Sequence, residues 1–110
     1  ANAIGAAAAG KPELADAVLT DATLVVDARE QCRHSGEINV PWSAGLLDEA
    51  SIHAELGAVV TGRLPGRTAE TGITVFDSTG LAVQDVAAAR VVYETAVDED
   101  RGTEFDLLGL

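Results

Sequence analysis

Apolar runs and stretches of helical spacing alternate along this chain of 110 residues. Short apolar runs occupy 1–5, 23–27 and 73–76, and the last two are rich in β-branched side chains. Such runs are typical of buried strands in a parallel sheet. Asp27 closes the second run and Asp77-Ser-Thr-Gly80 follows the third, so both strands are predicted to end in polar residues.

Between these runs, apolar side chains recur three and four positions apart, which is the spacing of one helix face. Strands separated by helices indicate an α/β fold with a mainly parallel sheet and flanking helices. A sheet of three strands leaves an edge to be covered by another part of a parent protein or by another copy. The predicted helices cover 13–21, 29–37, 46–61 and 81–97, and the Pro- and Gly-containing segments 38–45 and 62–67 are predicted as a loop and a turn.

The charge of the chain excludes some classes of partner. There are 18 Asp and Glu residues against 7 Lys and Arg, which gives a net charge of −11 and a pI of about 4.3. Nucleic-acid binding is excluded because neutralising phosphates requires a basic face. An anionic membrane surface is disfavoured for the same reason. A surface that is acidic and poor in lysine favours a salt-adapted (halophilic) organism over an ordinary acidic domain, since carboxylates keep a protein hydrated.

Individual residue types narrow the location and the chemistry. The chain begins with Ala1 and lacks Met, which favours an excised or processed segment, and no apolar run reaches the ~20 residues of a membrane span. Cys32 is alone, so no internal disulfide forms and a reducing, cytoplasmic location is expected. A lone cysteine is more often a small buried side chain than a nucleophile. His34 and His53 have no cysteine or acidic cluster beside them, so no metal site is predicted.

A glycine-rich turn near the start holds the only lysine of the chain. Gly5, Gly10 and Lys11 have the G-x-x-x-x-G-K spacing of a triphosphate-binding loop, but Pro12 replaces the Ser or Thr that would ligate magnesium. The G-x-G-x-x-G fingerprint of dinucleotide-binding folds is absent. A third interpretation is a strand-to-helix turn in which glycines permit close packing. The spacing alone favours this third interpretation.

A second segment, Ile73-Thr-Val-Phe-Asp-Ser-Thr-Gly80, also ends a strand and opens a helix. In doubly wound sheets, ligands bind beyond the carboxyl ends of the strands, where helix N-termini present N–H groups. Two such turns at one edge of a sheet predict a cleft for an anionic or dinucleotide ligand. The plainer interpretation of Ser78 or Thr79, each taken alone, is a helix N-cap.

Three blocks of sequence carry a family resemblance. They are Ala3-Ile-Gly-Ala with Gly10-Lys-Pro-Glu-Leu14, then Gly62-Arg-Leu-Pro-Gly-Arg67, then Ile73 through Arg90. Blocks of this kind in this order resemble the C-terminal third of the ornithine cyclodeaminase/mu-crystallin family, which includes archaeal alanine dehydrogenases. The resemblance implies that 1–97 form the C-terminal part of a Rossmann-type NAD(P)-binding domain and that 98–110 are a C-terminal tail.

The resemblance also implies a chemistry. In this family NAD or NADP takes a hydride from the α-carbon of an amino acid to give an imine, and cyclodeaminases then cyclise, lose ammonia and return the hydride. The parent protein is expected to bind a small amino or imino acid and to form a homodimer. The family's cofactor contacts carry over to a short set of positions, Ile4, Gly5, Ala6, Lys11 and Ser78.

The sequence departs from the family at its catalytic position. The acidic residue that the family places two positions after the first glycine is Ala7 here, and Ala9 replaces a proline. Alanine cannot move a proton, so no catalytic residue is predicted in this segment. The family's glycine fingerprint and substrate-binding Arg and Lys lie upstream of the matching region. The segment is expected to be inactive alone, and its parent to be an oxidoreductase or cyclodeaminase, or a non-enzymatic ligand-binding or oligomerisation module.

Overall fold

The computed structural model describes residues 1–4 and 12–109 of the chain. These residues form two compact units, Ala1–Gly80 and Leu81–Leu110. The first unit contains the sheet and all the short helices, and the second contains one long helix and the tail.

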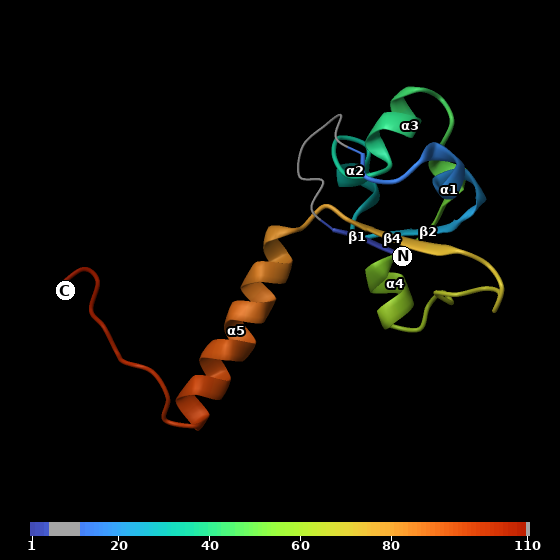
Figure 1. Cartoon of the computed structure of the whole chain (residues 1–110). Coiled ribbons are helices and arrows are strands. Elements are labelled where there is room, and N and C mark those ends of the chain that lie inside the picture. The colour runs from blue at the N-terminus through green and yellow to red at the C-terminus, as the bar shows by residue number, and fades with distance from the viewer. Residues whose placement is uncertain (5–11, 110) are drawn as a thin grey trace. The chain divides into compact units, whose positions relative to one another are not determined.

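The first unit is built on a parallel sheet of four strands in the order β1-β4-β2-β3 (Figure 1). The sequence pattern predicted three of these strands, and their parallel direction is confirmed. Because all four strands run the same way, their carboxyl ends meet at one edge of the sheet. The strands are β1 (Asn2–Ile4), β2 (Thr23–Val26), β3 (Ile52–Glu55) and β4 (Thr74–Ser78).

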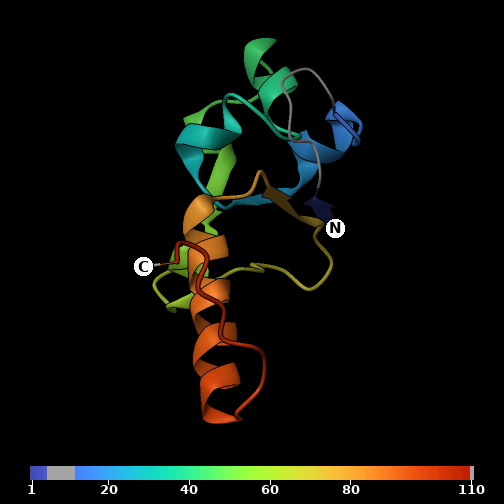
Figure 2. The ribbon, with the colours of Figure 1, turned by 90° about the vertical axis from the view of Figure 1, so that its left-hand side faces the viewer.

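Short helices connect the strands on both faces of the sheet. In both views α1, α2 and α3 lie on one face and α4 lies on the other (Figures 1 and 2). The connections from β1 to β2 and from β2 to β3 cross the sheet in one direction, whereas the connection from β3 to β4 returns. Right-handed crossovers place a returning helix on the opposite face, as is seen. The helices are α1 (Asp16–Asp21), α2 (Arg29–Cys32), α3 (Asn39–Ser43), the 3-10 turn η1 (Glu49–Ser51) and α4 (Leu56–Val60).

The hydrophobic core of the first unit lies between the sheet and α1 to α3. Leu24 and Val26 alternate with Val25 along β2, so these two side chains point to the same face of the sheet and join the core cluster. Apolar burial on this scale is the main term that stabilises so small a unit. The cluster comprises Leu19, Leu24, Val26, Cys32, Ile38, Leu47, Ile52 and Val75.

The helix predicted over 46–61 is wrong, because this stretch contains β3. Ile52 and Ala54 are buried and the residues between and after them are less so, which is the period of two of a strand. The apolar residues of this stretch also lie three and four positions apart, which fits a helix equally well. In so short a run, spacing alone does not distinguish a helix from a strand. β3 adds the fourth strand to the predicted sheet.

Two further boundaries differ from the prediction. The helix expected over 29–37 ends at Cys32, and it could not have reached residue 37 because Gly36 has a φ of 84°, which no α-helix continues. The loop expected over 38–45 contains the short helix α3, whose Pro41 lies in its first turn, where a missing N–H costs little.

The second unit consists of α5 (Ala82–Asp98) followed by residues without regular structure. The predicted helix over 81–97 is therefore confirmed to within one residue at each end. Its valines are not buried: Val83, Val86, Val91 and Val92 are each more than 60% exposed. Among the described residues, α5 and the other helices are too short or too polar to cross a membrane.

Candidate functional site

The carboxyl edge of the sheet brings two predicted cofactor residues together. Ile4 ends β1 and pairs in register with Ser78, the last residue of β4, although 74 positions separate them in the sequence. Ile4 is 67% exposed and Ser78 is half-buried. Gly5, Ala6 and Lys11, the other predicted contacts, and the unusual Ala7 lie outside the described residues.

Asp27 organises the turn that follows β4. It comes directly after β2, is 8% exposed, and accepts hydrogen bonds from three consecutive residues of the turn. Thr79 Oγ1 donates to Oδ1 over 2.9 Å, while Gly80 N and Ser78 Oγ donate to Oδ2 over 2.8 and 3.4 Å. The N–H of Ala28 completes the set at 3.0 Å. A carboxylate with this many donors is well compensated for its burial.

This arrangement fixes the direction of the two hydroxyl groups. Ser78 and Thr79 give their protons to Asp27, so the remaining lone pairs of both oxygens are left to accept hydrogen bonds. The expectation that either residue is the helix N-cap is wrong, because α5 begins after Leu81. The Leu81 N–H is bonded by Gln84 Oε1 over 3.3 Å instead. The turn therefore presents oxygen acceptors rather than a capped helix end.

The side chain of Gln31 secures the other end of the turn. Its amide nitrogen, on α2, donates to the carbonyl oxygen of Gly80 over 2.7 Å. Gly80 has a φ of 81°, and the space where a Cβ would stand is open. The turn is thus held between β2 and α2, and its glycine is required by the backbone conformation rather than by crowding.

A second carboxylate, Asp77, lies one residue before Ser78 and is 1% exposed. Its Oδ2 accepts from the N–H of Ile38 over 3.3 Å, while Oδ1 is buried and accepts no hydrogen bond within the described residues. Burial raises the pKa of Asp77 above its ordinary 3.8, and the charges of Glu37 and Asp27 add to the rise. The nearby N–H groups of Glu37 and Ile38 act in the opposite direction.

A third carboxylate, Glu37, is fully buried and holds the chain ahead of α1. The Glu13 N–H lies 2.8 Å from each oxygen, and the Leu14 N–H lies 2.7 Å from Oε2. The helix predicted over 13–21 begins only at Asp16, because the residue before it, Ala15, has an extended backbone with a ψ of 143°.

The arginines at the start of α2 and just after its end are paired away from this turn. Arg29 donates to Glu49 and to the carbonyl oxygen of Ile52, and Arg33 forms an ion pair with Glu49 and lies over the Trp42 ring at 5.0 Å. The carboxyl edge is therefore polar through hydroxyl, amide and buried carboxylate groups. Within the described residues no three His, Cys, Asp or Glu side chains are grouped to hold a metal ion.

Cys32 is a core residue, as the sequence predicted. It is fully buried in the core cluster, and its thiol donates to the carbonyl oxygen of Arg29 over 3.1 Å. Burial raises its pKa to about 11, and the charge of Asp77 contributes in the same direction. A thiol that stays protonated is a poor nucleophile.

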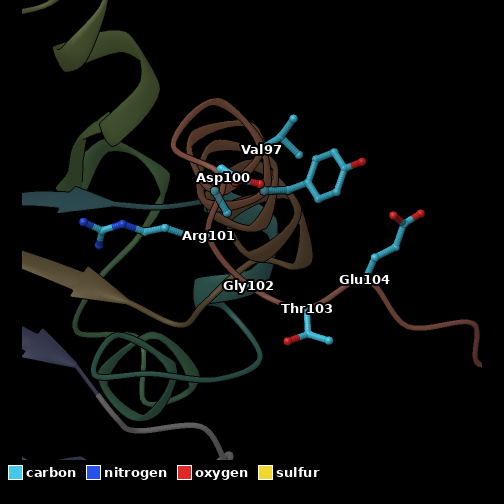
Figure 3. A pocket seen from close by; sticks show the side chains of 8 residues that line it. Val97, Asp100, Arg101, Gly102, Thr103 and Glu104 are labelled. Carbon is cyan, nitrogen blue, oxygen red and sulfur yellow. The ribbon is translucent and has the colours of Figure 1, made fainter.

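A hollow of about 490 Å³ lies in the second unit, between the end of α5 and the tail (Figure 3). Val97, Asp100, Arg101 and Glu104 line it, and each is exposed. Arg101 forms an exposed ion pair with Glu99 at 2.9 Å. Its volume alone does not make this hollow a binding or catalytic site. The carboxyl edge of the sheet is the better candidate site.

The sequence did not identify the three buried carboxylates as part of the site. Asp27 and Asp77 were seen only as polar ends of strands, and a carboxylate after an apolar run is the signal that would have found them. Nothing in the sequence indicated that Glu37 is buried, because a glutamate beside a glycine is most often a solvated residue of a turn.

Comparison with known proteins gives consistent results. The sequence profile of the ornithine cyclodeaminase/mu-crystallin family matches residues 1–100. Alanine dehydrogenase of Archaeoglobus fulgidus is 50% identical over 103 residues, which cover 94% of this chain and 32% of that protein. The chain thus spans about a third of the length of this relative.

Two solved structures are similar to the chain. A structure of a dimeric archaeal alanine dehydrogenase with bound NAD has a TM-score of 0.86 at 48% identity, covering 97% of this chain and 33% of the other. The iminosuccinate reductase of Paracoccus denitrificans in complex with NAD+ has a TM-score of 0.84 at 37% identity, covering 96% of this chain and 32% of the other. Both are similar in fold to the segment.

Proposed function

This chain belongs to the ornithine cyclodeaminase/mu-crystallin family, and from that premise we propose that it is the C-terminal part of an NAD(P)-dependent oxidoreductase. The parent protein acts at the α-carbon of an amino or imino acid. Residues 1–97 belong to its NAD(P)-binding domain, and 98–110 form its tail. The observation that carries the proposal is the pairing of Ile4 with Ser78 at the carboxyl edge of a parallel sheet.

The proposed cofactor contacts are Ile4, Gly5, Ala6, Lys11 and Ser78. Ile4 presents an exposed apolar side chain beside the half-buried hydroxyl of Ser78, and an aromatic ring with a polar substituent fits such a surface. The hydroxyl oxygens of Ser78 and Thr79 are acceptors, because their protons go to Asp27. Acceptors suit an amide N–H or a ribose hydroxyl.

The same chemistry suggests which half of the cofactor lies here. The turn offers uncharged acceptors in front of the Asp27 carboxylate, and a pyrophosphate would be repelled by both. We therefore place the nicotinamide and its ribose at this edge, and the pyrophosphate at the parent's other half. When bound, the cofactor supplies hydride transfer. The described residues bind and orient it.

A non-enzymatic binding or oligomerisation module is the second candidate, and one observation favours it. The position where the family carries its acid is Ala7, which cannot transfer a proton. Under this alternative the parent binds the cofactor and an amino or imino acid without turning it over.

Further properties of the parent belong to the same proposal. A homodimer is proposed because a related alanine dehydrogenase is a dimer. A cytoplasmic location and a salt-adapted organism are proposed from the lone reduced cysteine and the net charge of −11.

Titration of the full-length protein with NADH and NADPH at high salt, followed by nucleotide fluorescence, tests the proposal. Binding together with turnover of alanine or a cyclic imino acid supports the oxidoreductase. Binding without turnover of any amino or imino acid supports the module. A full-length protein that binds neither nucleotide would contradict both.

A further inference from the structure

We propose that Glu37 is a positioning residue for cofactor binding, because it ties the main chain at Glu13 and Leu14 to the segment that holds the end of β4. This inference rests on the proposed function. It assigns a role to a side chain that lies outside the five proposed cofactor contacts.

The first part of the link is the carboxylate of Glu37. Both of its oxygens accept hydrogen bonds from main-chain N–H groups, at 2.7 and 2.8 Å, and these groups lie 23 and 24 positions away in the sequence. Bonds to an ionised carboxylate are stronger than those between neutral groups, and burial strengthens them further. Glu13 and Leu14 follow Lys11 by two and three positions in the sequence, so Glu37 holds the main chain shortly after this proposed cofactor contact.

The second part of the link joins the neighbours of Glu37 to β4. The N–H of Ile38 donates to Asp77 Oδ2 over 3.3 Å, one residue before Ser78. On the other side of Glu37, Gly36 has a φ of 84° and lies so close to Asp77 and Thr79 that no side chain fits between them. Segment 36–38 therefore contacts β4 through its backbone and residues 13–14 through its side chain.

The alternative is that Glu37 only stabilises the fold. The segments that its hydrogen bonds connect distinguish this structural role from a role in positioning the cofactor. Glu37 is fully buried. A buried charge costs more free energy than it contributes unless well-placed hydrogen-bonding partners compensate it. An apolar side chain of similar volume would avoid the cost of burying a charge but would leave the N–H groups of Glu13 and Leu14 without an acceptor. The carboxylate joins residues 13–14, which follow Lys11 in the sequence, to the segment that contacts the end of β4 beside Ser78. The relative position of such segments determines how well a cofactor is oriented.

The test uses Glu37→Gln in the full-length protein and measures the dissociation constant of NADH well below the unfolding temperature. Glutamine keeps the volume but has one acceptor oxygen and turns an NH2 group toward main-chain N–H donors. We expect the dissociation constant to rise about tenfold, as for the loss of one charge-assisted hydrogen bond. Glu49→Gln is the matched control, because Glu49 pairs with Arg29 and Arg33 in the same unit and contacts neither linked segment. The control should bind NADH as the unsubstituted protein does.

The outcomes separate this inference from the proposed function. If the unsubstituted protein binds no NADH, the proposed function fails and the inference fails with it. If Glu37→Gln is folded but less stable and binds NADH within twofold of the unsubstituted protein, Glu37 is structural and only the inference is overturned. A tenfold loss of affinity in a folded variant supports it.

A second measurement needs no variant, in case the substitution prevents folding. Hydrogen exchange at the amides of Glu13 and Leu14 is followed in the unsubstituted full-length protein with and without NADH. We expect both amides to exchange several-fold more slowly with NADH, because cofactor binding stabilises the segment that Glu37 anchors. Unchanged exchange at both amides under saturating NADH would overturn the inference.

Discussion

Gly36 and Asp77 lie so close together that a methyl group on Gly36 would overlap the carboxylate. A Cβ at this position would stand 2.7 Å from Asp77 Oδ2 and 2.8 Å from Oδ1. The φ of Gly36, 84°, is also one that L-residues rarely adopt. Neither carboxylate oxygen can move away easily, because Asp77 is buried. The contact makes glycine obligatory at the point where segment 36–38 meets β4.

We therefore predict that Gly36→Ala destabilises the full-length protein by about 3 kcal/mol, from positive-φ strain and overpacking together. Gly45→Ala is the matched control, because Gly45 has a φ of 75° and nothing within 4 Å of its Cβ position. The control should lose only about 1 kcal/mol, the strain alone. Urea unfolding of both variants measures the difference, and equal losses would show that the contact with Asp77 is unimportant.

Asp77 also predicts a dependence of stability on pH. Its folded-state pKa is raised above the ordinary 3.8, so the folded protein holds this proton more tightly than the unfolded chain does. The stabilisation from protonated Asp77 is fully present below the unfolded pKa and is lost as the pH rises through the folded pKa. Asp77→Asn cannot ionise, so its stability relative to the unsubstituted protein should increase between pH 4 and pH 7. Urea unfolding over this pH range tests the sign, and a decrease would contradict the assignment.

The same reasoning applied to Cys32 predicts an unreactive thiol. With a pKa of about 11 instead of 9.0, the thiolate fraction at pH 8 falls about a hundredfold. Reaction with a disulfide reagent at pH 8 should therefore be about a hundredfold slower in the folded protein than in urea. Stability from the protonated thiol is present below pH 9.0 and is lost toward pH 11, so Cys32→Ala should flatten the alkaline decline in stability. Fast labelling of Cys32 in the folded protein would contradict its burial.

The fold class was predictable because strand runs such as 23–26 are short, apolar and rich in β-branched residues. Strand β3 was not predictable, since Ile52 and Ala54 also fit the helical spacing of their neighbours. Only their pairing with β2 distinguishes a strand from a helix here. Ser78 was predicted at the correct end of a strand, but its bond to Asp27 joins residues 51 positions apart. Contacts of this kind depend on strand order, which a single sequence does not contain.

The same limit explains the buried charge. Glu37 looks like a solvated residue in the sequence, because it follows Gly36 in a polar stretch. In the structure its carboxylate is buried against the main-chain N–H groups of Glu13 and Leu14. Because every residue except proline carries such an N–H group, the sequence does not reveal which ones bind a side chain.

Ala7 is the position where the proposed chemistry is most open to direct test. The family resemblance assigns the catalytic acid to this position, and a positioned acid or base typically contributes a hundredfold or more to proton transfer. If the parent protein binds NADH but turns over amino or imino acids slowly, Ala7→Asp should raise its kcat by about a hundredfold and leave the dissociation constant of NADH nearly unchanged. The reason is that the carboxyl group acts on the substrate's proton and leaves the proposed contacts with NADH intact.

The neighbouring variant Ala8→Asp is the control, because it adds the same charge one position further along the same segment. A general electrostatic effect of the added carboxylate would change kcat in both variants alike. An increase confined to Ala7→Asp assigns the effect to the acid position. If neither variant changes kcat and the unsubstituted protein is already fast, the proton is supplied by a group in the parent's other half, and Ala7 is neutral for catalysis.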